Sequence, residues 1–84
     1  MYTIEVAGGG PVGGVQQIRF SPDERVRLIV RSDTAEVVEI PGYGITRRVR
    51  AGSSARIYFE TTKEGLFEIE LARGHSRIGV MTVG

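Results

Sequence analysis

The sequence predicts an all-β domain, folded as a sandwich or a barrel. Apolar residues occur at every second position in one segment after another, which is the period of a strand with one buried face. Turn-forming residues separate these segments at short and even intervals. No apolar pattern with the period of a helix extends over about ten residues.

The expected strands are the alternating segments, which cover residues 2–6, 15–20, 25–31, 35–40, 45–49, 55–60, 66–71 and 77–83. Inward-facing side chains are clearest in four of them: Ile4 and Val6; Ile18 and Phe20; Val26, Leu28 and Val30; and Phe67, Ile69 and Leu71. The alternate positions are mostly polar or charged and are expected to face water. Turns are expected at 21–24, 32–33, 41–44, 51–54 and 62–65, and a glycine-rich loop at 8–14.

Size and charge limit the function. The 84 residues make one domain, residues 1–84, because two hydrophobic cores would not fit. The net charge of +1 gives no strong field for nucleic acid or an acidic membrane. No apolar run approaches the roughly 20 residues of a membrane-spanning helix, and no signal-peptide pattern precedes the first strand. The absence of cysteine excludes disulfides and thiolate sites and leaves the redox compartment open.

The basic residues are biased toward arginine. Ten of the 11 are arginines, only Lys63 is a lysine, and the chain has no asparagine. Arginine forms better forked ion pairs than lysine, and asparagine is heat-labile. We therefore hypothesise a heat-tolerant domain, although a genome of high GC content would produce the same bias.

Two local motifs have a plain explanation. Gly8, Gly10 and Gly13 match a dinucleotide-binding spacing, but the next segment alternates like a strand, and that chemistry needs a helix there. We interpret the glycines as a connection. A basic cluster at residues 47, 48 and 50 has no interleaved aromatic residues, so we expect a solvated strand face whose arginines pair with glutamates on neighbouring strands.

The remaining reactive side chains form no obvious site. His75 is the only histidine, so the usual ligands cannot build a zinc or blue-copper centre. No Ser-His-Asp order suggests nucleophilic catalysis, and Glu68 and Glu70 are expected on a solvent face without a cleft. Met81 is expected in the core. We predict that the protein is not an enzyme.

Ordered apolar and glycine landmarks carry a family resemblance. They are residues 26–33, 38–44, 51–52, 57–59, 65–70 and 78–83. Over residues 2–83 this pattern resembles the cupredoxin family, in particular short, often exported bacterial cupredoxin-like domains. The resemblance implies a Greek-key β-sandwich of seven to eight strands. It also implies a copper site formed by a mid-chain histidine, a cysteine, a histidine and often a methionine around the loop before the last strand.

The ligands that this resemblance implies are missing from the sequence. Glu39 and Pro41 occupy the stretch where relatives often carry histidines, and no cysteine stands near Leu71. His75 lies in the right loop, but close to the last strand, and Met81 follows the position of the axial methionine. Type 1 copper electron transfer depends on a copper–thiolate bond, so this chain cannot perform it.

We therefore expect a metal-free binding or structural module without a cofactor, in the periplasm or outside the cell by resemblance. Its partner would be another protein or a neighbouring domain, and the chain would be a monomer or a weak homodimer. The expected interaction surface combines the turn at 41–44 with the loop at 73–77; its residues are Pro41, Tyr43, Arg73 and His75. Two alternatives remain: weak copper(II) or zinc binding by His75 with Glu39 or Glu70, and a trimmed or designed scaffold without native activity.

Overall fold

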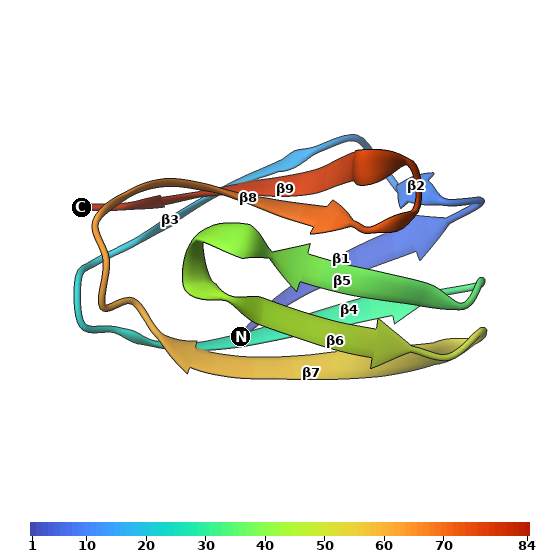
Figure 1. The fold of residues 1–84 in the computed structure, drawn as a ribbon, viewed down its shortest axis with the longest axis horizontal. Helices are drawn as coiled ribbons and strands as arrows, with labels where there is room; N and C mark the ends of the chain where they lie inside the picture. The colour runs from blue at the N-terminus through green and yellow to red at the C-terminus, as the bar shows by residue number, and fades with distance from the viewer.

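Two mixed β-sheets pack face to face in the computed structural model, which describes residues 1–84 (Figure 1). One sheet has the order β2-β1-β4-β7, and the other has the order β3-β9-β8-β5-β6. The strands are β1 Tyr2–Ala7, β2 Gly10–Pro11, β3 Gln16–Phe20, β4 Arg25–Ser32, β5 Glu36–Ile40, β6 Ile45–Val49, β7 Ser53–Glu60, β8 Gly65–Leu71 and β9 Ser76–Val83. Two short 3₁₀ turns, η1 Pro41–Tyr43 and η2 Arg73–His75, complete the chain.

The predicted fold class is confirmed. The chain crosses between the sheets at the connections β2–β3, β3–β4, β4–β5, β6–β7 and β7–β8, which gives a Greek-key sandwich. All eight expected strands are present: β6 has the expected bounds, and each of the others differs by one or two residues at one end. The sandwich has nine strands rather than seven or eight because of β2. No helix is long and apolar enough to span a membrane.

The glycine-rich segment at 8–14 contains more structure than the predicted loop. Val6 pairs with Pro11 and Ala7 with Gly10, so β1 and β2 form a tight hairpin. Gly8 and Gly9 adopt φ values of 60° and 80°, which this turn needs and which glycine accepts without strain. The sequence therefore specifies a hairpin turn here, and the expectation of a plain loop is corrected.

The core lies between the two sheets and follows the predicted alternation. A single cluster of 17 buried apolar residues includes the inward positions expected for β1, β3 and β4. Ile69 and Leu71 of β8 are fully buried, and Phe67 packs against the cluster from its margin. Met81 is 1% exposed, which confirms that it is a core residue.

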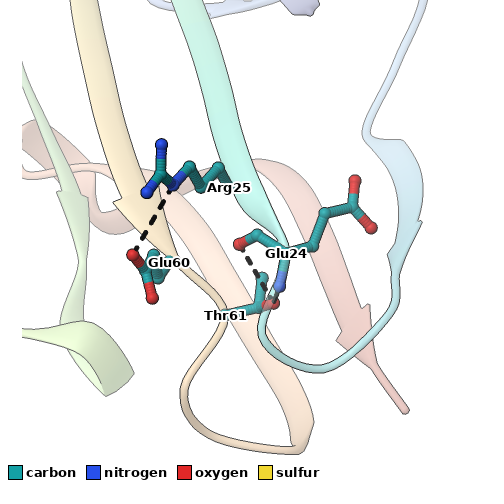
Figure 2. A network of polar contacts seen from close by, with 4 residues as sticks. All are labelled: Glu24, Arg25, Glu60 and Thr61. Carbon is teal, nitrogen blue, oxygen red and sulfur yellow. Dashed lines mark hydrogen bonds and ion pairs between the residues drawn. The ribbon is translucent and has the colours of Figure 1, made fainter.

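A polar clasp joins the β3–β4 turn to the end of β7. The hydroxyl of Thr61, a fully buried residue, accepts a hydrogen bond of 2.8 Å from the Glu24 amide and donates one of 2.7 Å to the Ser21 carbonyl. Figure 2 shows the contact between Thr61 and Glu24 beside the ion pair between Arg25 and Glu60, whose charged atoms are 3.8 Å apart. The ion pair is exposed and contributes little to stability, whereas the enclosed hydroxyl fixes the turn.

The arginines do not form the expected ion pairs. Only Arg25 with Glu60 and Arg77 with Glu68 are in ion-pair contact. The arginines at 47, 48 and 50 have no glutamate partner. On β5, Arg47 and Arg48 stand opposite valines, and the one glutamate on the outer face of β5 stands opposite Thr46. The prediction of arginine–glutamate pairing at this cluster is wrong. The heat tolerance inferred from composition stays a prediction.

Candidate functional site

The two loops expected to share an interaction surface lie at opposite ends of β5. The turn η1 follows the last residue of β5, whereas η2 follows β8, which runs antiparallel and places Leu71 opposite Val38. The guanidinium of Arg73 accordingly reaches the Ala35 carbonyl, before β5 begins. Figure 1 shows the connection after β5 on the left and the β8–β9 connection on the right. The expectation of one shared end is wrong, because the two loops are separated by the length of a strand.

Tyr43 and Pro41 belong to the η1 end, where Tyr43 is bound into the fold. The Tyr43 ring packs edge-on against Phe59 and Phe67, with centroid distances of 5.3 and 4.8 Å. The Lys63 ammonium donates to the Gly42 carbonyl at 3.0 Å and lies over the Tyr43 ring. These contacts give Tyr43 a structural role.

His75 lies at the other end and is an exposed turn residue. Its φ of 50° places it in the left-handed region, which histidine adopts more often than most residues do. The strand register brings Glu39 opposite Glu70, so the two carboxylates considered as its partners are neighbours. However, no three His, Asp or Glu side chains gather closely enough to hold a metal ion. Nothing in this arrangement favours the metal-binding alternative.

The chain does not fit a type 1 copper centre. Leu71 is the residue nearest to the expected cysteine position, and its apolar side chain is fully buried in the core. Met81 also points into the core, away from the β8–β9 connection. With no thiol in the chain, the donor set for this centre does not exist.

A hollow lined by arginines opens at the end that carries η2. Its volume is about 620 Å³, and its lining residues are Ala35, Glu36, Val37, Arg48, Val49, Arg50, Ala72 and Arg73. None of the three guanidinium groups is paired with a carboxylate. Arg73 was expected at the interaction surface, whereas Arg48 and Arg50 were expected only on a solvated strand face. We call this depression the arginine hollow.

Glu36 also lies at this end and was not among the residues expected to form a site. It is only 6% exposed, its Oε2 accepts a hydrogen bond of 2.8 Å from the Thr34 hydroxyl, and its buried Oε1 has no hydrogen-bond partner. A buried polar atom without a partner costs about 1–3 kcal/mol, and more when it is charged. The alternation along the strand could have drawn attention to this residue. Glu36 shares the inward face of its strand with Val38 and Ile40, where a carboxylate is unexpected.

A second, smaller hollow adjoins the same residues. It has a volume of about 320 Å³ and is lined by Gly8, Gly9, Thr34, Glu36 and Arg73, none of which has an apolar side chain. Glu36 and Arg73 border both depressions. We call the smaller one the polar hollow. The β1–β2 hairpin forms part of its wall, and the Asp33 carboxylate holds that hairpin by accepting a hydrogen bond from the Gly8 amide at 3.1 Å.

Solved structures share the architecture described above. One chain of a heme-copper terminal oxidase dimer superposes with a TM-score of 0.78 at 16% identity, and the match covers 96% of this chain and 60% of that one. The periplasmic domain of subunit II of cytochrome oxidase from Bradyrhizobium japonicum gives 0.69 at 15% identity, covering 98% and 83%. A purple cupredoxin from Nitrosopumilus maritimus gives 0.67 at 15% identity and is covered completely, as is this chain.

The sandwich is therefore a cupredoxin-like fold, as the sequence resemblance implied. The chain spans about 60% of the terminal oxidase chain that it matches. No protein-family model and no curated protein matches it in sequence. At these identities the likeness concerns the fold alone, so the function must be argued from the residues of this chain.

Proposed function

We propose that this cupredoxin-like domain is a binding module that works without a type 1 copper centre and is not an enzyme. The observation that carries the proposal is the arginine hollow, where Arg48, Arg50 and Arg73 border one depression and none is paired with a carboxylate. Guanidinium groups bind carboxylates through forked, charge-assisted hydrogen bonds. A partner that presents carboxylates would satisfy groups that the fold itself leaves without a counter-charge.

The partner that these groups suit is an acidic segment of another protein or of a neighbouring domain. The small net charge of the chain and the absence of exposed aromatic residues around the hollow support a protein partner over nucleic acid. We place the domain outside the cytoplasm. The support is the shared fold with a periplasmic oxidase domain, and fractionation of cells that express the full gene product would test the location.

Titration of the isotope-labelled domain with a short oligoglutamate peptide tests the binding proposal by nuclear magnetic resonance. The largest shifts are expected at Arg48, Arg50 and Arg73, and binding should weaken as salt screens the charges. Replacing Arg48 and Arg50 together by glutamine should weaken binding, while Arg19→Gln on β3 serves as the control. Absence of binding, or an equal loss in the control variant, contradicts the proposal.

A further inference from the structure

The polar hollow contains a carboxylate with unused hydrogen-bonding capacity. Glu36 is enclosed, one of its oxygens is occupied by the Thr34 hydroxyl, and the other accepts nothing. The oxygen near the hollow is Oε2, which lies beside Gly9, and a carboxylate oxygen can accept a second hydrogen bond in addition to the one from Thr34. An ionised carboxylate accepts hydrogen bonds only, and its strongest partner is a cationic donor.

The wall of the polar hollow leaves room at this carboxylate. A Cβ atom on Gly9 would stand 4.0 Å from Glu36 Oε2, so a larger side chain at this position would extend over the carboxylate. Arg73 borders the same hollow, yet its guanidinium donates to the Ala35 carbonyl at 3.4 Å and makes no ion pair with Glu36. The fold therefore brings the two opposite charges to one hollow without joining them.

Glu36 and Arg73 border both hollows, so the two depressions lie next to each other. Their combined wall carries one buried carboxylate and three guanidinium groups. A ligand with one ammonium group and two carboxylates complements these charges. We infer that the joined hollows bind a dicarboxylic α-amino acid, with its ammonium group on Glu36 and its carboxylates on the arginines. This inference goes beyond the proposed function, because it assigns a free amino acid to the surface where the proposed function places an acidic protein segment.

Calorimetric titration of the whole chain with L-glutamate tests the inference, with glutarate as the matched ligand that lacks the ammonium group. L-glutamate should bind more tightly than glutarate, and Glu36→Gln should lower its affinity about tenfold or more, because a charge-assisted hydrogen bond is lost. The same substitution should not weaken glutarate binding, because it removes a negative charge that repels the two carboxylates. Glu64→Gln, in the exposed turn before β8, is the control variant.

Each outcome decides between distinct explanations. Equal affinities for L-glutamate and glutarate, or full L-glutamate affinity in a folded Glu36→Gln variant, overturn the ammonium site. If oligoglutamate still binds and Arg48→Gln with Arg50→Gln weakens it, the proposed function stands while this inference fails. If neither L-glutamate nor oligoglutamate binds, both fail. Thermal unfolding followed by circular dichroism shows whether Glu36→Gln is folded. Thr34→Val provides a second variant: it frees Oε2, so it should raise the affinity for L-glutamate and leave the affinity for glutarate unchanged.

Discussion

The hydroxyl of Tyr43 exchanges two hydrogen bonds with the backbone of Lys63, donating to its carbonyl at 2.6 Å and accepting from its amide at 3.1 Å. The two residues are 20 positions apart in sequence. One side chain thus fixes the turn after β5 to the segment that leads into β8. These two hydrogen bonds stabilise the end of the sandwich that faces away from the arginine hollow.

Removing the Tyr43 hydroxyl should lower the free energy of unfolding. Tyr43→Phe keeps the ring contacts with Phe59 and Phe67 and deletes both hydrogen bonds, so we expect a loss of about 1 kcal/mol, measured by urea denaturation. Tyr58→Phe is the matched control, because Tyr58 is 57% exposed and its hydroxyl makes no hydrogen bond. Similar losses in both variants would show that the Tyr43 bonds add nothing. Neither substitution should affect binding at the arginine hollow.

The close approach of Gly42 to Phe67 should not tolerate a side chain. A Cβ atom at Gly42 would overlap the Phe67 ring, so Gly42→Ala should destabilise the domain by about 1–3 kcal/mol, as overpacking does. Gly10→Ala is the control, since a Cβ atom there meets nothing within 4 Å and the backbone φ is not positive. Thermal unfolding by calorimetry compares the two. An unchanged melting temperature for Gly42→Ala would mean that the ring moves aside without cost.

The buried hydroxyl of Thr61 should matter more than its exposed neighbour. Thr61→Val keeps the shape of the side chain but leaves the Glu24 amide without its acceptor, which should cost about 1–3 kcal/mol in chemical denaturation. Hydrogen exchange at the Glu24 amide should accelerate as well. Thr62→Val, at an exposed position whose hydroxyl makes no hydrogen bond, should change the free energy of unfolding by less than about 0.5 kcal/mol. Equal effects would exclude the clasp as a source of stability.

Neutralising Glu36 should stabilise the domain while it weakens ligand binding. Glu36→Gln removes an enclosed charge whose Oε1 has no partner, so the free energy of unfolding should rise by about 1 kcal/mol. Residues that serve binding commonly lower stability in this way. Glu64→Gln, with an exposed side chain, should have almost no effect. A less stable Glu36→Gln variant would show that the charge is compensated inside the fold and would favour an internal pairing with Arg73.

The alternation of apolar residues was sufficient to predict the strands and most of the core, because a sandwich buries one face of each strand. Strand register and the ends of the sandwich could not be predicted in this way. Which loops meet at one end depends on how β5 and β8 pair, and this pairing separates Tyr43 from Arg73. Periodicity alone also treats Glu36 as a strand residue, although its inward position already conflicts with its charge.

The position of β9 has a consequence for how the molecule folds. This last strand lies between β3 and β8 in the interior of its sheet, and its pairing with β3 joins Gln16 to Gly79. Pairing two segments so far apart in the sequence closes a large loop. The chain loses conformational entropy in closing this loop before the contacts between β3 and β9 can compensate for it. During synthesis, β3 has no partner in its sheet until β9 has left the ribosome. The edges of β3 and β8 stay open for that interval, so aggregation is most probable before the final strand is inserted.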